Sequence, residues 1–441
     1  MSAIVDFPVK PEARPYLEAF EAEAEPRWLA TARKQALSRF GELGFPTRKS
    51  ESWCYLDLQP LARRPLLPGG AQHQPDLDAA RAQLSRLSLP GSGLRLVLLD
   101  GLSVWDLSII EESLGGDLWF GSVVSAYAEK EELLPDVAHA VPGGPAHPFA
   151  ALNEAFFADG YILEVRPGVV LDRPIEIIHL ASGHDERSFH TRNLIALGPG
   201  SRASIVEIYA GDGRYWRNDV TAARLGEGAE LRRTVLVEES AAAVRLSHLD
   251  AKLAAGARLE AFALLLGGYR VREEANVQFE GEGASCDING AFIAAGEDEA
   301  NVVTAIDHAA PRCRTSELIK GVAAGRGHGA FQGRITVRKH AQQTDARQLS
   351  RNLILGRRAA IDTKPELEID ADDVKCSHGA SVGDLDEAAL FYLQARGISA
   401  DEARRMLIEG FLSETVEAIG DPGVRDYLSR RLAMRLAALE G

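Results

Sequence analysis

The residues best suited to chemistry in this sequence lie in one short stretch, Asp373 to Ala380. Within it, the thiol of Cys376 and the imidazole of His378 are two residues apart. In an extended strand, residues i and i+2 project from the same face, so these two side chains would point together. Thiolate and imidazole are ligands for soft metals, and the adjacent Gly379 lets other backbone approach closely. The spacing therefore indicates a candidate metal site.

The same two residues also have a purely structural interpretation. A lone cysteine is more often a small buried apolar residue than a ligand, and a lone histidine is more often a hydrogen-bonded structural residue. Candidates of lower rank for the same chemistry are Cys286, Cys313, His308 and His328. Cys286 falls within a repeat pattern, which favours a core position. Arg312 and Arg314 flank Cys313, and their charges are expected to lower the pKa of its thiol.

Composition excludes several classes of function. The chain has 441 residues and a formal net charge of -15, which argues against nucleic acid or an anionic membrane surface as the main partner. Asp6 and Pro8 interrupt any secretory signal, and no run of about eighteen apolar residues predicts a membrane span. The four cysteines are widely spaced and suit a reducing compartment. We therefore expect a cytoplasmic protein without a preformed four-cysteine site.

The first 160 residues carry a mixed helix and strand pattern. Apolar periodicity predicts helices within residues 11–43, 76–87, 122–132 and 149–157, and a buried strand over residues 94–100. Between the first two helical regions, residues 44–56 break the pattern with Gly and Pro and gather aromatic residues. We interpret this segment as a loop whose Trp53 and Tyr55 pack on the domain, in preference to a binding loop. The chain has no phosphate-binding glycine motif, so a nucleotide fold is not supported.

From Tyr161 onward the sequence changes to short strands separated by glycine. Gly200, Gly228, Gly256 and Gly283 fall about 28 residues apart, and each leads into an alternating strand. Later echoes begin at Gly329, Ala359 and Gly379, with a looser period. Regular spacing without intervening helices predicts stacked β units, as in a β-solenoid. A β-sandwich of long meanders is the structural alternative.

The last sixty residues return to helix. Asp386 can cap a helix that ends at Gly397, Ser399 and Glu402 form a capping box for the next, and Asp421 precedes a third. Amphipathic helices at a terminus either dock back on the solenoid as a cap or offer a groove to a partner. The pattern alone leaves both interpretations open.

Longer motifs surround the stretch with Cys376 and His378. They are Asp307-His308, Ser316-Glu-Leu-Ile-Lys-Gly321, Phe331-Gln-Gly-Arg-Ile-Thr-Val337, Thr344-Asp-Ala-Arg-Gln-Leu-Ser-Arg-Asn-Leu353, Lys364-Pro-Glu-Leu-Glu-Ile369, Leu390-Phe-Tyr-Leu-Gln-Ala-Arg-Gly397 and Glu409-Gly-Phe411. Together they resemble the SufB/SufD family of iron–sulfur cluster assembly scaffolds. The run Pro46-Thr-Arg-Lys-Ser-Glu-Ser-Trp53 is similar to the family's Lys-x-Glu-x-Trp segment. The resemblance covers most of the chain and is weakest over about residues 60 to 160.

Two departures make the chain more similar to the SufD branch than to SufB. SufB proteins often carry a cysteine cluster near the N-terminus, where this chain has only Cys54. SufB also typically has glutamate after the histidine of the corresponding stretch, where this chain has Gly379.

The resemblance implies a mainly β fold, with a right-handed parallel β-helix core flanked by N-terminal helical and mixed α/β regions and a C-terminal α-helical domain. We expect an N-terminal helical region at 1–90, a mixed α/β segment at 91–160, the β-helix core at 161–383 and the C-terminal helical domain at 384–441. The resemblance also implies a heterodimer with a SufB-like paralogue through the β-helix, and binding of a SufC-like ATPase through residues 384–441. A homodimer is an alternative for the isolated chain.

By the same resemblance, His378 and Cys376 help to hold a nascent iron–sulfur cluster at the subunit interface, with further ligands from the partner. His378 would be the primary ligand of this chain and Cys376 a secondary one. No catalytic activity and no tightly bound cofactor of the isolated chain are expected. Two other interpretations stay open: a purely structural subunit with an inert Cys376 and His378, and, with less support, a carbohydrate-active β-solenoid enzyme.

Overall fold

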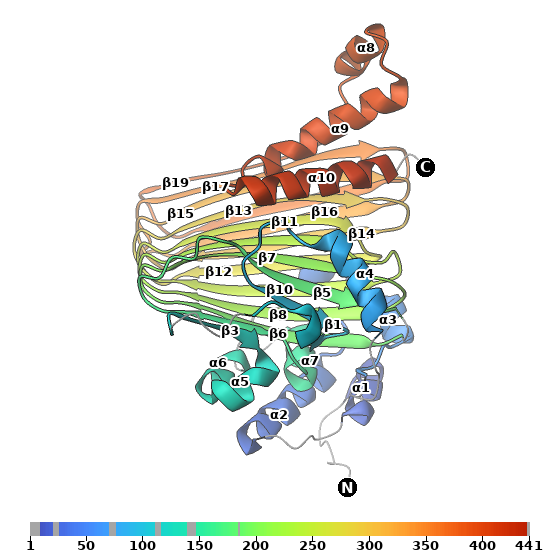
Figure 1. Ribbon diagram of the computed structural model, residues 1–441. Coiled ribbons are helices and arrows are strands. Elements are labelled where there is room, and N and C mark those ends of the chain that lie inside the picture. Colours follow the sequence, from blue (N-terminus) through green and yellow to red (C-terminus); the bar gives the residue numbers. More distant parts are fainter. Residues whose placement is uncertain are drawn as a thin grey trace.

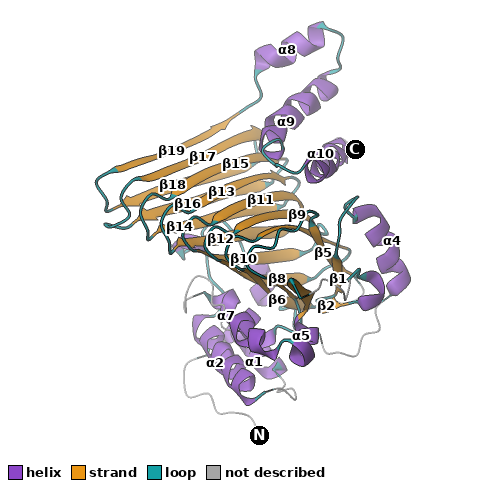
Figure 2. Ribbon diagram, turned by 60° about the vertical axis from the view of Figure 1, so that its left-hand side comes forward, coloured by secondary structure: helices purple, strands orange, loops and turns teal. Residues whose placement is uncertain are grey.

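The core of the molecule is a parallel β-solenoid made of two facing sheets (Figures 1 and 2). The computed structural model describes residues 9–20, 26–69, 76–110, 116–138, 147–183 and 186–438. From β4 (Tyr161–Val165) to β19 (Val374–Gly383), successive strands alternate between the sheets, and each pairs in parallel with the strand two places along, giving eight turns. The predicted β-solenoid is thus confirmed. The alternative β-sandwich of meanders is wrong, because its neighbouring strands would be antiparallel.

The strands divide between two sheets. Sheet A contains β3 (Leu118–Ser122), β4, β6 (Ser188–Leu197), β8 (Trp216–Leu225), β10 (Val244–Leu253), β12 (Arg270–Phe279), β14 (Glu299–His308), β16 (His328–Val337) and β18 (Ala360–Ile369). Sheet B contains β1 (Arg95–Leu99), β2 (Leu102–Ser103), β5 (Ile175–Ala181), β7 (Arg202–Gly211), β9 (Glu230–Glu238), β11 (Arg258–Gly267), β13 (Ser285–Ala294), β15 (Arg314–Ala324), β17 (Thr344–Leu355) and β19. Strands from the segment 91–160 therefore join the solenoid sheets.

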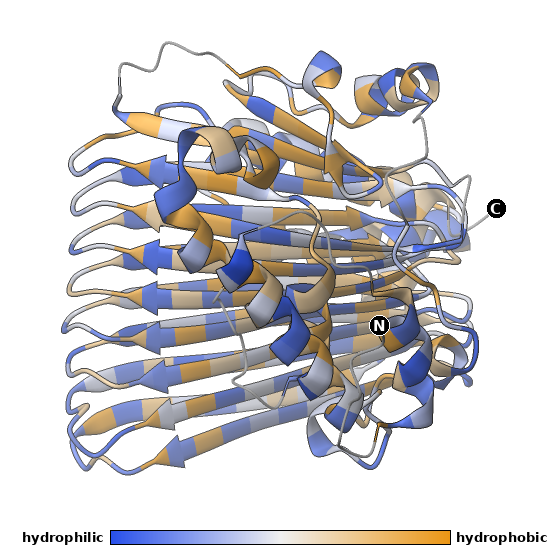
Figure 3. Cartoon of the chain, turned by 90° about the horizontal axis from the view of Figure 1, so that it is seen from below, coloured by the Kyte–Doolittle hydropathy of each residue, from blue (hydrophilic) through white to orange (hydrophobic). Residues whose placement is uncertain are grey.

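The corners of the solenoid explain the glycine repeat. Gly200, Gly228, Gly256 and Gly283 all have positive φ angles between 63° and 73°, a conformation in which a side chain is strained. The strands that follow are in register at steps of 28, 28 and 27 residues, as in Arg202, Glu230, Arg258 and Ser285. Along the strands, hydrophobic and hydrophilic residues alternate, which Figure 3 shows as orange and blue bands.

The repeat continues beyond Gly283 without glycine. The next corners on the same side are Arg312 and Gln343, with φ angles of 59° and 62°. The predicted later echoes at Gly329 and Gly379 are wrong as corners, because these residues lie inside β16 and β19. The looser period in the sequence therefore reflects a change of corner residue, since the parallel register itself continues to β19.

The N-terminal end of the solenoid is covered. There β2 pairs antiparallel with β1, and β3 pairs antiparallel with β4, so each sheet ends on a short reversed strand. The flanking helices are α1 (Arg14–Ala19), α2 (Arg27–Leu43), α3 (Gln59–Arg63), α4 (Leu77–Leu87), α5 (Val123–Glu129), α6 (Leu134–Ala138) and α7 (Pro148–Phe156). Trp216 of β8 is fully buried among Tyr16, Phe45 and Phe149 of this layer. Trp53 is also buried, against Phe149, as expected for a packed loop.

The C-terminal end of the solenoid is open. In the part of the chain that the structure describes, no strand pairs with the outer edge of β18 or of β19. Most residues of both strands are exposed or half-buried, in contrast to the preceding turns. Figure 2 shows β18 and β19 at the upper edge of the stack, with helices to one side only. The backbone donors and acceptors of two edge strands are therefore free to pair with another chain.

The three C-terminal helices are placed in two different ways. Helix α10 (Pro422–Ala438) and the second half of α9 (Ala400–Val416) bury apolar side chains against the outer face of sheet B. The Tyr427 hydroxyl donates to the carbonyl of Leu87, at 2.5 Å, which ties α10 to α4. Helix α8 (Glu387–Ala395) buries no residue and projects from the body, as Figure 1 shows. Within the described residues, no helix is long and apolar enough to cross a membrane.

Candidate functional site at the open end of the solenoid

Cys376 and His378 lie on β19, the last strand of sheet B, and both occupy inward-facing positions. Their neighbours in register on β17 are Ala346 and Gln348, which are buried in the solenoid interior. The predicted extended strand with both side chains on one face is therefore what the structure shows. His378 is nevertheless exposed, because among the residues that the structure describes no further turn of the solenoid covers it.

The two side chains differ in their surroundings. Cys376 is half-buried and packs against the main hydrophobic core. Burial raises the pKa of its thiol, so the neutral form dominates near neutral pH. The site as it stands in this chain is thus an exposed imidazole beside a partly covered thiol. A soft metal with bound sulfide would have to displace the thiol proton to gain both ligands.

Two buried polar residues lie behind His378 in the same column of the sheet. Glu317 of β15, Gln348 of β17 and His378 are consecutive partners in register. Gln348 Nε2 donates to Glu317 Oε2 at 2.5 Å, and both side chains are about 2% exposed. Burial raises the pKa of Glu317 to about 7. Sequence reasoning missed this pair, although its separation of 31 residues is the length of one turn.

The lower-ranked cysteines are structural. Cys286 is fully buried in the core, as expected, and burial raises the pKa of its thiol. Burial also raises the pKa of Cys313, so the expected lowering by its arginine neighbours is wrong. The reason is that both arginines point to acidic partners: Arg312 contacts Glu282, and Arg314 contacts Asp287 at 3.0 Å.

The lower-ranked histidines each have another partner. His308 is buried, and its Nε2 lies 2.9 Å from the hydroxyl of Thr315, while burial lowers its pKa to about 4. His328 Nε2 lies 2.7 Å from Asp362 Oδ2, in an ion pair or hydrogen bond at the start of β16. Cys376 and His378 therefore remain the candidate soft ligands at the open end.

A second cluster of potential ligands was not predicted. His147, His248 and Glu274 bring one ligand atom each to within 4.8 Å of one another on the side of sheet A. The Nδ1 atom of His147 accepts a hydrogen bond from the backbone N–H of Ala150 at 3.0 Å. The neutral imidazole therefore carries its proton on Nε2, which faces Glu274 Oε2 at 3.6 Å.

The polar contacts of this cluster suit a held carboxylate better than a metal ion. His248 Nε2 faces the side-chain amide of Asn276 at 3.2 Å, and its Nδ1 faces Glu274 at 3.4 Å. Burial alone would raise the pKa of Glu274, but the charge of Arg272 at 2.8 Å holds it well below its usual value. Both imidazoles thus direct N–H groups at a carboxylate. The lone pairs that a metal would need are used elsewhere.

A network of buried charges fills the middle of the solenoid. Glu207 accepts two hydrogen bonds from Arg233, at 2.6 and 3.0 Å, and two more from the hydroxyls of Tyr161 and Tyr209. Burial alone would raise the pKa of Glu207, but Arg233 lowers it, so the carboxylate is ionised. All four side chains are buried.

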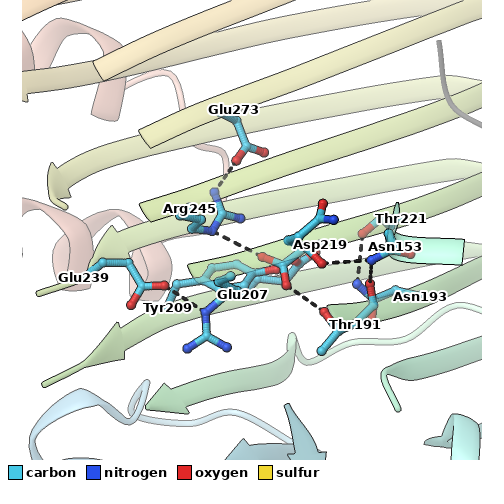
Figure 4. Close-up of polar contacts among 12 residues, drawn as sticks. Asn153, Thr191, Asn193, Glu207, Tyr209, Asp219, Thr221, Glu239, Arg245 and Glu273 are labelled. Atoms are coloured by element: carbon cyan, nitrogen blue, oxygen red, sulfur yellow. Dashed lines mark hydrogen bonds and ion pairs between the residues drawn. The ribbon is translucent and has the colours of Figure 1, made fainter. Parts of the chain in front are cut away.

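The network extends across both sheets. Figure 4 shows Glu273, Arg245, Asp219 and Thr191 joined in one chain of contacts. Burial raises the pKa of Asp219 to about 6 even though Arg245 lies near. Charges buried this deeply are tolerated only when they are paired and hydrogen-bonded. These residues therefore act as internal structure and are far less accessible than the open end.

The chain is similar to known proteins of iron–sulfur cluster assembly. A family model described as the SufBD core domain of the SUF system for FeS cluster assembly matches residues 179–411. The iron–sulfur cluster assembly protein SufD of Escherichia coli is 30% identical over 422 residues, covering 95% of each chain. The chloroplastic protein ABCI7 of Arabidopsis thaliana is 31% identical and covers 75% of this chain and 71% of its own length. SufD of Bacillus subtilis is 26% identical over 94% of this chain and 95% of its own.

Proposed function

Since the chain belongs to the SufB/SufD family of iron–sulfur cluster assembly proteins, we propose that it is a non-enzymatic scaffold subunit whose open solenoid end holds a nascent cluster. His378 is the primary ligand from this chain and Cys376 the secondary one. The cluster is cargo that the scaffold builds and releases. The related proteins are named for assembly, which favours a scaffold over an enzyme.

One observation carries the proposal: an exposed inward-facing histidine and a half-buried cysteine share the uncovered end of the solenoid. A cluster needs more protein ligands than these two. Among the described residues, the one group of three potential ligands lies elsewhere, at His147, His248 and Glu274. The remaining ligands therefore come from a second chain that covers the open end. A shared ligand set suits release, because separating the chains breaks the coordination.

The same open end supports a SufB-like paralogue as the partner. The edge strands β18 and β19 present unpaired backbone groups of the kind that pair with strands of another chain. A paralogue with its own solenoid would continue both sheets across the interface. Two copies of this chain would bring together two sets of the same ligands, which is the homodimer alternative for the isolated protein.

A SufC-like ATPase would bind the part of residues 384–441 that the body leaves free. Helix α8 exposes Phe391 and Tyr392 by 73% and 56%, and Met406 on the first half of α9 is also exposed. Helix α10 is not available, because its apolar residues lie against sheet B. Nucleotide binding to the ATPase could then move α8 and shift the equilibrium between a closed and an opened interface, provided it binds the two states unequally.

The ligand assignment is tested in the reconstituted complex. We expect His378→Ala to lower the cluster absorbance after loading by more than half, and Cys376→Ala to lower it less. His340→Ala is the matched control, since this histidine is exposed and its Nε2 faces the carbonyl of Ala309. Unchanged loading in the single and double variants of Cys376 and His378 would contradict the proposal and favour a purely structural subunit.

The docking assignment needs a milder change than removing the whole domain. Deleting residues 384–441 would uncover the apolar face of sheet B and disturb folding. We expect the double substitution Phe391→Ala and Tyr392→Ala to weaken capture of the ATPase at least tenfold, with little change in stability. Met434→Ala is the control, because Met434 is 61% exposed on α10. Equal ATPase binding by both variants would contradict docking through α8.

A further inference from the structure

A histidine that holds a metal through one ring nitrogen almost always donates the N–H of the other to an acceptor in the protein. This bond fixes the tautomer and orients the ring. His378 is exposed at the end of the solenoid. Its acceptor should therefore lie in the turn behind it, where the side chains of neighbouring strands share one face.

The parallel register identifies that turn. His378 is paired with Gln348, and Gln348 with Glu317, so the three side chains form one inward-facing column. Neighbouring strands in a sheet are about 4.8 Å apart. A glutamine side chain can span that distance to an imidazole on the next strand. Cys376 belongs to a different column, in which Ala346 and then Thr315 are the partners in register. Ala346, its direct neighbour, has no hydrogen-bond acceptor in its side chain.

Only one of the two polar atoms of the Gln348 side-chain amide has a hydrogen-bond partner. Its Nε2 donates to Glu317 Oε2 at 2.5 Å, but within the described residues its Oε1 has no hydrogen-bond partner. The side chain is 2% exposed, and an acceptor buried this deeply destabilises the fold when it has no partner. The column therefore ends in a buried carbonyl oxygen one strand away from an imidazole.

A glycine makes room for this amide. A Cβ atom at Gly333, on the facing strand β16, would lie 2.2 Å from Gln348 Nε2 and 2.8 Å from its Cδ. The amide thus lies against the opposite sheet, between Gly333 and Glu317. Packing from the far sheet and the bond to Glu317 together restrict the amide, as is needed for a group that orients a ligand.

We propose that Gln348 is a positioning residue for His378: its Oε1 accepts the N–H of one ring nitrogen, which leaves the other with its lone pair turned toward the open end. Glu317 fixes the amide in the orientation that presents Oε1. The part of this inference that concerns the cluster rests on the proposed function. The tautomer of His378 does not, and it can be measured in the metal-free chain.

The first test follows the ring nitrogens of His378 by nitrogen-15 NMR, with the resonances assigned from His378→Ala. We expect one dominant tautomer in the wild type and a mixture of both in Gln348→Leu. The matched control is Asn352→Leu, which removes another buried amide from the same face of β17, in register with Val382. The control should leave the His378 spectrum as in the wild type.

A swap variant separates positioning from packing. In the double substitution Glu317→Gln and Gln348→Glu, the new amide can donate to the new carboxylate, which still offers an oxygen toward His378. We expect the swap to restore the single tautomer that Gln348→Leu loses. The inference is overturned if Gln348→Leu leaves the nitrogen shifts of His378 unchanged, or if Asn352→Leu alters them equally.

The second test measures Co²⁺ affinity in the metal-free reconstituted complex. Loss of a partner that orients a ligand typically weakens metal binding by about 10- to 100-fold, so we expect that change in Gln348→Leu and wild-type affinity in Asn352→Leu. If His378→Ala binds Co²⁺ as the wild type does, the ligand role of His378 fails, whereas the nitrogen spectra still decide the role of Gln348. If His378→Ala weakens binding but Gln348→Leu does not, Gln348 is not a positioning residue.

Discussion

The two ends of the solenoid are built in opposite ways. At the N-terminal end, reversed strands β2 and β3 complete the sheets, and helices pack over the strands that follow. At the C-terminal end, β18 and β19 remain as open edges, and inward-facing Val382 is 42% exposed. A solenoid needs a cap for solubility. Within the described residues, the end at β18 and β19 lacks such a cap, which supports the proposal that another molecule covers it.

The interiors behind the two ends differ as well. Toward the capped end, the buried charges of Glu207, Arg233, Arg245 and Glu273 are joined in ion pairs. Toward the open end, Glu317 has no cation paired with it among the described residues and bonds to the neutral Gln348. The same type of residue, a buried carboxyl, is thus ionised in one region and half-titrated in the other. Substitutions should have opposite effects in the two regions.

The largest expected loss of stability comes from the capped end. Trp216→Ala removes a fully buried ring from the aromatic cluster that joins the helices to sheet A. Replacing a large buried aromatic residue by alanine costs about 3–5 kcal/mol, and urea unfolding would measure it. Trp105→Ala is the control, since Trp105 is 52% exposed and should change stability by less than about 1 kcal/mol. Similar losses in both variants would contradict the assigned packing.

The ion-paired interior should respond almost as strongly. Arg233→Met leaves the buried carboxylate of Glu207 without its cation, which typically costs about 3–5 kcal/mol. The control is Arg202→Met, which breaks an exposed ion pair with Glu230 on the neighbouring strand. It should lower the free energy of unfolding by about 0–1 kcal/mol. Adding Glu207→Gln to Arg233→Met should recover part of the stability in urea unfolding. No recovery would indicate that Arg233 acts through packing instead of charge.

Near the open end, removing a charge should stabilise the protein. The folded pKa of Glu317 is about 7, above the usual value of 4.5, so the folded state retains a proton that the unfolded state has lost. The resulting decrease in the free energy of unfolding is absent below about pH 4.5, grows as pH rises, and is complete above pH 7. Glu317→Gln should therefore raise the free energy of unfolding at pH 8 by up to about 3 kcal/mol, and by about 1 kcal/mol less at pH 6.

The control for this pH dependence is Glu297→Gln. Glu297 lies on the surface and pairs with Arg326, so its substitution should give the same small effect at both pH values. A Glu317→Gln variant that is equally destabilised at pH 6 and pH 8 would show that Glu317 is ionised and stabilising in the folded protein.

The smallest effect on stability, but a clear effect on association, is expected at the edge itself. Val382→Lys adds a charge to an exposed inward position of β19 and should change the free energy of unfolding by less than about 0.5 kcal/mol. If a partner covers the open end, the buried charge should weaken the heterodimer at least tenfold in sedimentation or titration. Ser381→Lys points outward and is the control. Equal binding by both variants would mean that the interior edge stays uncovered.

The solenoid was predictable because its corners repeat in the sequence. Gly200, Gly228, Gly256 and Gly283 mark the turns at nearly constant spacing. The repeat became hard to follow where Arg312 and Gln343 took the same left-handed conformation, since neither residue type indicates it. Asp386 and Ser399 cap helices as their types suggested. The sequence of α10 could not show that this helix packs on sheet B, because an apolar stripe does not specify the surface it covers.

The candidate site was predictable only in part. Two-residue spacing on a strand was enough to place Cys376 and His378 on one face. The exposure of His378 could not be derived, since it depends on β19 being the last strand. Gln348 and Glu317 belong to no motif and become neighbours only through the register. His147 and Glu274 likewise come from separate elements that the fold brings together.

The bond from Tyr427 to the carbonyl of Leu87 joins residues 340 positions apart. Helix α10 is synthesised after α4 and after every strand of sheet B. The apolar outer face of sheet B, including Leu236 and Phe262, therefore stays uncovered until α10 has emerged from the ribosome. An interrupted chain that ends before Pro422 would keep this face exposed to chaperones and proteases. Synthesis of α10 is thus a condition for a stable, protease-resistant subunit.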